Sequence, residues 1–312
     1  MIFLDKADVL RIPRQWNELL DTIEETVHIL SNNDFSQPIK PYLRFGDPAN
    51  RIIAMPAFVG GDIDMAGIKW IASFPKNINK GIARANSVTI LNNSNTGEPV
   101  CIINSTLISE VRTAAVSGTM IRKFLEVSKG GKLKIGIVGF GPIGQRHLEM
   151  IDALFSDQIE TVFLYDINKV DEEKIPASIA SKVIIANSWQ DTFETADIFI
   201  TATVSSDRYI DLVPKKGSLH LNISLRDYQP EVINHINYMV VDNWEEICRE
   251  NTDIEIMHKK YNLNKENTLN LIDVFTQNAL SKFKEDEVIM FNPMGMAIFD
   301  ISIAKYFYKK AI

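Results

Sequence analysis

Hydrophobic and polar positions alternate in two different ways along the chain. Before residue 100, the stretch "ELLDTIEETVHILSNN" has the spacing of a helix, whereas "RIIAMPAF", "MAGIKWIASF" and "NSVTILNNSNTGEPVCII" are apolar runs typical of strands. In the last of these, "NNSNTGEP" places Asn, Gly and Pro between two β-rich runs, which predicts a hairpin because these residues favour tight turns. We therefore expect an α+β segment with antiparallel strands.

The pattern changes after residue 100. One long helix is predicted over residues 105–125, because "STLISEVRTAAVSGTMIRKFL" lacks Pro, has helical spacing and offers Ser105 or Thr106 as a cap. After "SKGGKL", strands alternate with helices, and this order predicts a doubly wound parallel sheet. The tail "AIFDISIAKYFYKKA" is again helical and amphipathic. The strands are expected near residues 134–139, 161–166, 182–186, 197–203, 218–223 and 238–241.

Composition narrows the possible functions. The 312 residues are enough for two domains, and the 46% apolar content is ordinary for a globular protein. A net charge of −7 argues against binding to nucleic acid or a membrane surface, since both carry phosphate charge. Neither the two cysteines, Cys101 and Cys248, nor the five histidines show the spacing of a disulfide framework or a metal site. We expect an unprocessed cytoplasmic protein with a small-molecule partner and no membrane span.

A nucleotide-binding pattern lies in mid-chain, in "KIGIVGFGPIGQRHLEM". Gly139, Gly141 and Gly144 follow an apolar strand and precede a helical run. The first glycine permits a tight turn, the second lets the backbone approach a pyrophosphate, and the third lets helix and strand pack closely. The free amide groups of the helix N-terminus complete the anion site. We expect Pro142 and Ile143, inside the turn, to belong to the same site.

Two further segments are expected at this edge of the sheet. Asp166 ends the next predicted strand, where a carboxylate accepts hydrogen bonds from ribose hydroxyls and repels a 2′-phosphate. NAD is therefore favoured over NADP, although the cation Lys169 weakens the preference. In "TATVSSD", Thr203, Val204 and Ser205 either contact the dinucleotide or form a plain hydroxyl-rich loop.

Three cations stand in apolar surroundings before the nucleotide-binding pattern: Arg44 in "PYLRF", Lys69 in "GIKWI" and Arg112 in "EVRTAA". Burying a cation is costly unless an anion is close. On a strand, Lys69 would point to the face opposite Ile68 and Trp70. A bound carboxylate would satisfy the two arginines, while each cation taken alone is equally consistent with a surface position or an internal salt bridge.

With these residues in place, the chain resembles the ornithine cyclodeaminase/mu-crystallin family over nearly its whole length. The resemblance implies a homodimer in which residues 1–115 and 293–312 form a substrate-binding and dimerisation domain. Residues 116–292 would form an inserted Rossmann-type NAD-binding domain, which explains why the glycine pattern lies in mid-chain. The matching stretches are, in order, "MPAF", "GIKW", "TGEPV", "LISEVRTAAVSGTMIRKFL", "IGIVGFGPIGQRHLEM", "NISLRD" and "NPMGMAIFDISIA".

The resemblance also implies roles for individual residues. Arg44 and Arg112 look like the pair that binds the substrate carboxylate, Lys69 like a substrate-contacting acid/base group, and Asp227 in "NISLRD" like the catalytic carboxylate. Without the resemblance, Asp227 is equally consistent with a turn or cap residue.

Three other residues are expected to have more general roles. Thr113 and Ser224 are expected among the cofactor-binding residues, and Asp300 is expected to cap or orient the C-terminal segment.

One departure separates members of the family. Ornithine cyclodeaminases carry a glutamate just before the "MP" pair to hold the distal amine of ornithine, and the matching residue here is Ile53. With "PYLR", "RIIAMP" and "NPMGMAI", the chain more closely resembles the dehydrogenases that form 2,3-diaminopropionate for siderophores and antibiotics. Their substrate, N-(2-amino-2-carboxyethyl)-L-glutamate, carries three carboxylates, so Arg51 becomes a further candidate for substrate binding or else a surface arginine.

The reaction implied is NAD-dependent oxidation of this secondary amine to an imine, which water hydrolyses to 2,3-diaminopropionate and 2-oxoglutarate. Lys69, with a pKa lowered by two nearby arginines, and Asp227 would share the proton transfers, without the sequence assigning each one. The alternatives are cyclodeamination of ornithine to proline and ammonia, ketimine reduction, and alanine dehydrogenation. A protein that binds the nucleotide without turnover is disfavoured by the presence of Lys69 and Asp227.

Overall fold

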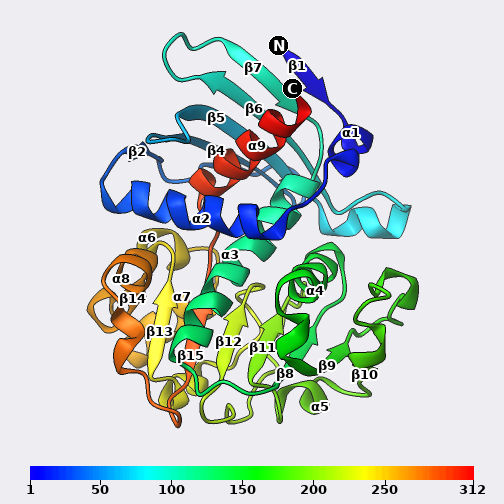
Figure 1. Cartoon of the computed structure of the whole chain (residues 1–312), viewed down its shortest axis with the longest axis vertical. Helices are drawn as coiled ribbons and strands as arrows, with labels where there is room; N and C mark the ends of the chain where they lie inside the picture. The colour runs from blue at the N-terminus through cyan, green and yellow to red at the C-terminus, as the bar shows by residue number, and fades with distance from the viewer. The chain divides into compact units, whose positions relative to one another are not determined.

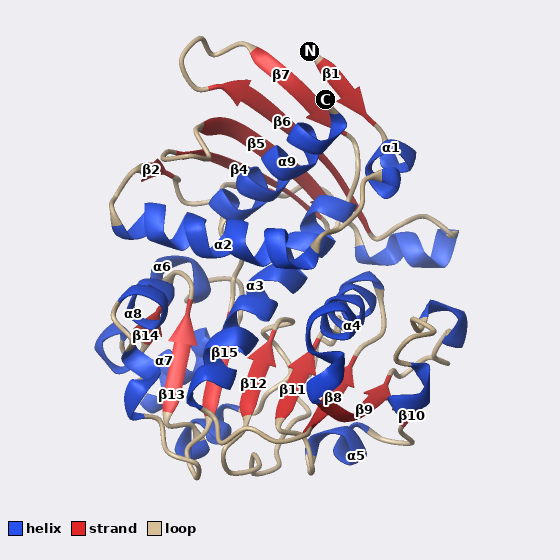
Figure 2. Ribbon diagram, in the orientation of Figure 1, coloured by secondary structure: helices blue, strands red, loops and turns tan.

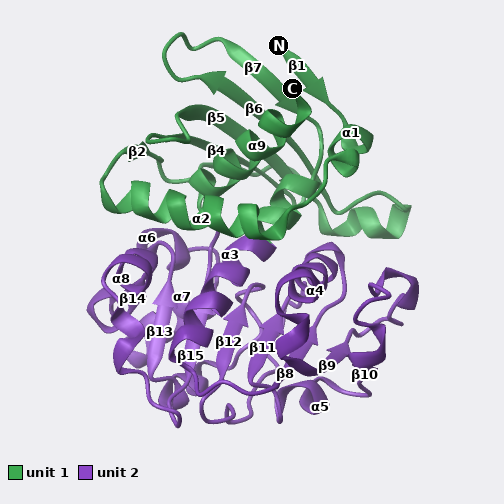
Figure 3. Ribbon diagram, viewed as in Figure 1, with its two compact units in different colours: residues 1–113, 296–312 green, residues 114–295 purple.

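A computed structural model describes all 312 residues, Met1 to Ile312. The chain forms two compact units, shown in Figure 3. Unit 1 consists of residues Met1–Thr113 and Met296–Ile312, and unit 2 consists of residues Ala114–Gly295. Unit 1 is thus assembled from two segments that unit 2 separates in the sequence. One helix, α3 (Leu107–Val127), begins in unit 1 and ends in unit 2.

Unit 1 is built around a seven-stranded sheet. Its strands are β1 (Ile2–Leu4), β2 (Phe35–Ser36), β3 (Tyr42–Leu43), β4 (Arg51–Val59), β5 (Met65–Ser73), β6 (Ala85–Asn93) and β7 (Pro99–Ile103). The strand order is β1-β7-β6-β5-β4-β2, with β3 also paired to β4. Only β1 and β7 are parallel. The predicted hairpin joins β6 to β7 and turns at Gly97, whose φ is 75°.

The helices of unit 1 are α1 (Lys6–Arg11), α2 (Trp16–Ser31), the 3-10 helix η1 (Pro75–Lys80) and α9 (Ala297–Ala311). The last of these, α9, lies on β4, β5 and β6 and packs against α2 (Figure 1). Gly67 on β5 faces α9, because a Cβ atom at this position would come within 2.9 Å of the Ile301 side chain. A buried hydrogen bond of 2.8 Å between the hydroxyls of Thr26 and Ser302 joins the two helices.

The strand register gives this sheet two different faces. On the face that α9 covers, Met55, Lys69 and Thr89 lie side by side on adjacent strands and are all buried. The opposite face carries an apolar row in which each residue lies directly beside the next on the neighbouring strand. That row is Pro56, Ile68, Ile90, Ile102 and Phe3.

Unit 2 contains an eight-stranded sheet, drawn in red in Figure 2, in which all strand pairs are parallel. Its strands are β8 (Leu133–Val138), β9 (Ile159–Tyr165), β10 (Val183–Ile185), β11 (Ile198–Thr201), β12 (Leu219–Asn222), β13 (Tyr238–Val241), β14 (Leu269–Asn270) and β15 (Ile289–Asn292). They lie in the order β10-β9-β8-β11-β12-β15-β13-β14, which confirms the predicted doubly wound sheet. The order reverses between β8 and β11, the position at which such sheets bind ligands beyond the strand ends.

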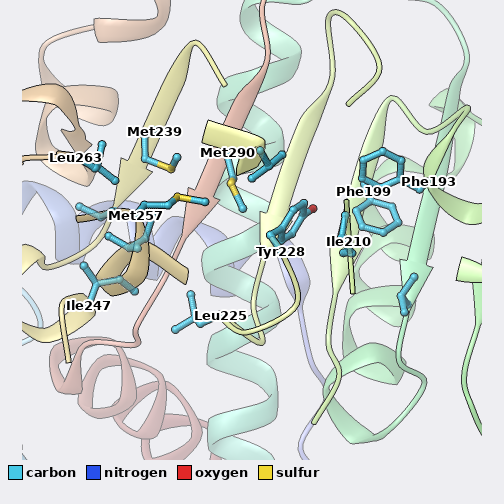
Figure 4. Close-up of a cluster of buried hydrophobic side chains, with 14 of the residues drawn as sticks. Phe193, Phe199, Ile210, Leu225, Tyr228, Met239, Ile247, Met257, Leu263 and Met290 are labelled. Carbon is cyan, nitrogen blue, oxygen red and sulfur yellow. The ribbon is translucent and has the colours of Figure 1, made fainter. Parts of the chain in front are cut away.

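The α-helices within unit 2 are α4 (Pro142–Phe155), α5 (Trp189–Phe193), α6 (Trp244–Ile247), α7 (Asp253–Tyr261) and α8 (Leu271–Thr276). Short 3-10 helices are η2 (Ser156–Gln158), η3 (Glu172–Lys174), η4 (Ala180–Lys182), η5 (Pro230–His235), η6 (Lys265–Asn267) and η7 (Ala279–Lys282). A buried apolar cluster, shown in Figure 4, includes Phe199, Tyr228, Met239 and Met290. None of the helices in either unit combines the length and the apolar character needed to cross a membrane.

One central strand was not predicted from the sequence. β15 inserts between β12 and β13, and all four of its residues are buried. A strand covered on both faces shows no polar–apolar alternation, and four residues are too few to distinguish it from any other short apolar run.

Candidate functional site

The glycine-rich turn joins β8 to α4, and its three glycines have different surroundings. Gly139 has a φ of 96°, and a Cβ atom there would lie 2.6 Å from the carbonyl oxygen of Ala202. A Cβ on Gly144 would overlap the carbonyl oxygen of Gly139. A Cβ on Gly141, in contrast, would have no atom within 4 Å. The turn is therefore closely packed at two glycines and open at the middle one, as the approach of a pyrophosphate requires.

The start of α4 completes this turn. Pro142 is the first helical residue and is exposed, Ile143 is half-buried, and the cap residue Gly141 has no side chain to bond the first-turn amides. Amide groups without a side-chain cap at a helix N-terminus are suited to binding an anion.

Asp166 follows β9 and is fixed beside the glycine turn. One carboxylate oxygen accepts the backbone N–H of Phe140 at 2.7 Å, and the other accepts the backbone N–H of Asn168 at 2.8 Å. The next residue, Ile167, is 89% exposed, and Lys169 is also exposed. The carboxylate is thus held at the edge of the sheet with an exposed apolar side chain beside it.

Asp227 lies in the loop after β12, where hydroxyl groups hold its carboxylate. Thr203, from the loop after β11, donates to one oxygen at 2.5 Å, and Ser224 donates to the other. The Thr203 hydroxyl also accepts the backbone N–H of Ser205 at 3.2 Å, while Val204 is exposed. Four of the predicted residues are therefore brought together here, and Val204 lies in the same loop.

The pKa of Asp227 is raised from 3.8 to about 6. Burial is the largest cause, the negative charge of Asp253 adds to it, and the hydrogen bond from Thr203 acts in the opposite direction. A carboxyl group with a pKa near 6 is suited to exchanging a proton close to neutral pH.

Asp253, at the start of α7, fixes the loop that carries Asp227. Its carboxylate accepts the backbone N–H groups of Asp227 and Tyr228, both at 3.2 Å, and the side-chain amide of Asn222 at 3.0 Å. Arg208 donates to it through Nε at 2.7 Å. Asp253 thus fixes the backbone of Asp227, while the carboxylate of Asp227 accepts hydrogen bonds from the hydroxyl groups of Thr203 and Ser224.

A cluster of buried charges lies in unit 1. Lys69, on β5, is 1% exposed, and its Nζ lies 2.8 Å from Oδ1 of Asp300, on α9. Arg112, on α3, donates to the same oxygen through Nε at 3.1 Å, and its two terminal nitrogens make no hydrogen bond within the chain. Oδ2 of Asp300 is buried without a hydrogen-bond partner. Thr113, next to Arg112, is buried and donates its hydroxyl to the Ser109 carbonyl at 2.7 Å.

Burial lowers the pKa of Lys69 from 10.5 to about 8. The charge of Asp300 opposes this effect, while the charges of Arg112 and Lys40 add to it. Two nearby arginines were expected to lower this pKa, but the largest cause is burial, and Arg112 is the arginine among the main causes.

The expectation that Arg44 lies in an apolar setting is wrong. Arg44 is exposed, donates to the carbonyl of Pro48 at 3.2 Å, and lies with its guanidinium 5.5 Å from the centre of the Tyr42 ring. Arg51 lies 5.7 Å from the same ring. Both arginines therefore lie near one aromatic side chain.

Two of the five histidines, His147 and His220, are packed in unit 2. His147 contacts the Ser117 hydroxyl and the Ile143 carbonyl, each at 2.8 Å, and burial lowers its pKa to about 4. His220 is also buried and contacts the Tyr228 hydroxyl at 2.8 Å. No group of three or more His, Cys, Asp or Glu side chains is arranged to hold a metal ion.

Sequence reasoning missed two charged residues of these clusters, Lys40 and Asp253, and it missed the ion-pairing role of Asp300. A signal existed for Asp300, because it is the single charged residue in the otherwise uncharged run "MAIFDISIA". A lone acid at a buried helical position needs a cation. No comparable signal marked Lys40, which is 3% exposed but follows the mixed stretch "SQPI".

Comparison with known proteins identifies the family. The sequence model of the Ornithine cyclodeaminase/mu-crystallin family matches residues 3–312. The chain belongs to this family. The resemblance noted from the short motifs is thereby confirmed over nearly the full length of the chain.

One curated relative is similar over the whole length of the chain. The N-((2S)-2-amino-2-carboxyethyl)-L-glutamate dehydrogenase of Staphylococcus aureus is 33% identical over 328 aligned residues, which cover 100% of this chain and 95% of that enzyme.

Two solved structures share the fold. Delta(1)-pyrroline-2-carboxylate reductase of Thermococcus litoralis, in complex with NADH and L-proline, matches with a TM-score of 0.88 at 22% identity, covering 100% of this chain and 97% of that one. An archaeal alanine dehydrogenase dimer with bound NAD matches with a TM-score of 0.83 at 22% identity, covering 99% and 95%.

The raised pKa of Asp227 predicts a pH-dependent gain in stability on Asp227→Asn. Because the folded state holds this proton up to about pH 6 and the unfolded state releases it near pH 3.8, the wild-type protein loses stability as the pH rises between these values. The side-chain amide in Asp227→Asn does not ionise, so the variant does not lose this stability. Urea unfolding at pH 8 should show the variant more stable by about 2 to 3 kcal/mol, with the difference disappearing near pH 4.

The control is Asp207→Asn, which changes an exposed carboxylate in a neighbouring loop and should leave the free energy of unfolding unchanged at both pH values. An equal gain for Asp227→Asn at pH 4 and pH 8 would contradict the assignment of the raised pKa to Asp227.

Proposed function

We propose that the protein oxidises N-(2-amino-2-carboxyethyl)-L-glutamate with NAD and releases 2,3-diaminopropionate and 2-oxoglutarate, for use in siderophore or antibiotic synthesis. The observation that carries the proposal is 33% identity, over the whole chain, to a dehydrogenase named for this substrate. In the reaction, the glutamate-side Cα loses a hydride and the amine nitrogen loses a proton. Water then adds to the resulting imine, and the C–N bond breaks.

The protein is an NAD-dependent oxidoreductase of its family. When bound, NAD supplies the hydride acceptor. The glycine turn fits a pyrophosphate, since space is left at Gly141, and the Asp166 carboxylate disfavours a 2′-phosphate. Unit 2 would therefore hold the dinucleotide. The other residues proposed to contact it are Thr113, Pro142, Ile143, Thr203, Val204, Ser205 and Ser224.

The side chains of the two charged clusters are proposed to bind the substrate carboxylate, to transfer a proton and to activate water. The two terminal nitrogens of Arg112 form a planar pair of donors that fits a substrate carboxylate. Lys69, with a pKa of about 8, can take up or give a proton at the substrate amine. Asp227, with a pKa of about 6, is mostly ionised at neutral pH and can activate water.

Substrate choice depends on residues around β3 and β4. Ile53 pairs with Tyr42 across these strands and offers no charge to a distal ammonium, which disfavours ornithine. Arg44 and Arg51 lie 5.5 Å and 5.7 Å from the centre of the Tyr42 ring and bring two positive charges to it. This pair is proposed to bind a second carboxylate of the substrate.

A homodimer is proposed on the basis of the apolar sheet face of unit 1. Trp70 and Phe3, on that face, are 43% and 58% exposed. A continuous apolar row across five strands is unusual for a solvent-facing sheet surface and is suited to burial against a second copy. The alanine dehydrogenase of the same fold is a dimer.

The proposed reaction predicts a rise in NADH absorbance when NAD and N-(2-amino-2-carboxyethyl)-L-glutamate are added to the purified protein. L-Ornithine and L-alanine should give no comparable rise. Lys69→Ala should lower the rate about 100-fold or more, since it removes the acid/base group. Formation of proline and ammonia from ornithine at constant NADH would instead establish cyclodeamination and overturn the proposal.

The open surroundings of Gly141 predict that Gly141→Val weakens NADH binding about tenfold or more without loss of fold stability, because the added side chain fills the space intended for the pyrophosphate. NADH fluorescence titration and thermal unfolding measure the two effects. In contrast, Gly139→Ala should lower the melting temperature itself, given its φ of 96° and the nearby Ala202 carbonyl. Unchanged NADH affinity in Gly141→Val would place the pyrophosphate elsewhere.

The apolar face predicts that Trp70→Glu converts the protein to a monomer, because a buried carboxylate in the interface would lack a partner. Light scattering after size-exclusion chromatography gives the mass. Ile167→Glu introduces the same charge at an exposed residue of unit 2 and should leave a dimer. A Trp70→Glu variant that remains dimeric would exclude this face as the interface.

A further inference from the structure

The charge cluster of unit 1 contains one carboxylate to which the proposed reaction gives no part. Asp300 is fully buried on α9, and one of its two carboxylate oxygens, Oδ1, contacts both Lys69 and Arg112. We propose that Asp300 is a positioning residue, which holds Lys69 and Arg112 in their working orientations and supplies the negative charge that lets Lys69 carry a proton. This inference rests on the proposed function, because that function assigns the acid/base role to Lys69 and carboxylate binding to Arg112.

The geometry supports the positioning of two cations by one anion. Lys69 comes from β5, Arg112 from α3 and Asp300 from α9, so the shared oxygen connects three elements. Two cations this close repel each other unless an anion lies between them. Because Asp300 accepts a hydrogen bond from Nε of Arg112, the orientation of the guanidinium is fixed while its two terminal nitrogens remain available to a carboxylate.

The charges around Lys69 support the second part of the proposal. Among the charged groups with the largest effect on Lys69, Asp300 on α9 is an anion, whereas Arg112 on α3 and Lys40 before β3 are cations. Burial and both cations lower the pKa of the lysine, and Asp300 raises it. Without this carboxylate, the pKa of Lys69 would be lower still, and a smaller fraction of the lysine would carry a proton at neutral pH.

The second oxygen of Asp300 argues against a purely structural role. Oδ2 is buried without a hydrogen-bond partner, which is unfavourable for a charged group. An apolar residue of similar size at this helical position would pack without that penalty. Retention of an unfavourable buried group is typical of positions that serve a site and not the stability of the fold.

The test is Asp300→Asn, which keeps the size of the side chain and removes its charge. A 15N NMR titration of the lysine Nζ signals, with Lys69→Met used to assign Lys69, reads the pKa of Lys69 without any substrate. We expect the wild-type pKa near 8 to fall by about one pH unit or more in Asp300→Asn. Asp62→Asn, which neutralises an exposed carboxylate of unit 1, should leave it unchanged.

Substrate-side measurements test the positioning. The affinity for 2-oxoglutarate should fall about tenfold or more in Asp300→Asn, while NADH affinity stays at the wild-type value and shows that the protein is folded. Asp300→Glu keeps the charge and displaces it, so it should restore the pKa of Lys69 more fully than the affinity for 2-oxoglutarate. If Asp300→Asn does not fold, this Glu variant alone decides: an unchanged affinity would overturn the positioning role.

The role of Asp300 and the role of Lys69 in catalysis can be disproved separately. If the pKa of Lys69 stays near 8 in a folded Asp300→Asn variant, the inference about Asp300 is wrong whatever the reaction is. If the pKa falls as expected but Lys69→Ala retains full activity, Asp300 still controls Lys69 and it is the assignment of Lys69 to catalysis that is wrong.

Discussion

The ion pair between Lys69 and Asp300 joins the two segments from which unit 1 is made. Lys69 lies on the covered face of the sheet, where a cation without an anion would cost several kcal/mol. The anion comes from α9, which follows unit 2 in the sequence. The helix approaches closely because Gly67, two residues before Lys69, leaves room for Ile301. The sheet of unit 1 therefore needs α9, which follows 182 intervening residues, to pair the buried charge of Lys69 as well as to provide apolar contacts.

Burial acts on the two candidate acid/base groups in opposite directions. It brings the pKa of Lys69 down from 10.5 to about 8 and the pKa of Asp227 up from 3.8 to about 6. The neighbouring charges then adjust each value, with an anion raising that of Lys69 and a second carboxylate, Asp253, raising that of Asp227. Between pH 6 and pH 8 both groups are charged, yet each lies within about one pH unit of changing state. Groups separated in this way are suited to distinct acid and base tasks.

The parts of the structure that the sequence predicted have local causes. The glycine turn was predictable because Gly139 is required by its backbone conformation, Gly144 by the nearby carbonyl oxygen of Gly139, and Gly141 by the space that a pyrophosphate needs. That Lys69 points to the face opposite Ile68 and Trp70 followed from alternation along a strand. What the sequence did not provide depends on distant partners. The pairing of Asp300 with Lys69, the burial of Lys40 and the exposure of Arg44 are set by packing between elements. The strand β15 was missed because a fully buried strand of four residues has no periodic pattern.

The position of β15 also bears on how unit 2 can form during synthesis. β12 and β13 are consecutive strands, yet they do not pair, because β15 lies between them. A ribosome supplies the chain from its N-terminus, so both strands have unpaired backbone groups along one edge until residues 289–292 have emerged. Exposed apolar edges of this kind are prone to association with other chains. The nascent protein should therefore depend on chaperones, or on rapid translation of residues 242–288, more than a sheet whose strands pair in the order in which they are made.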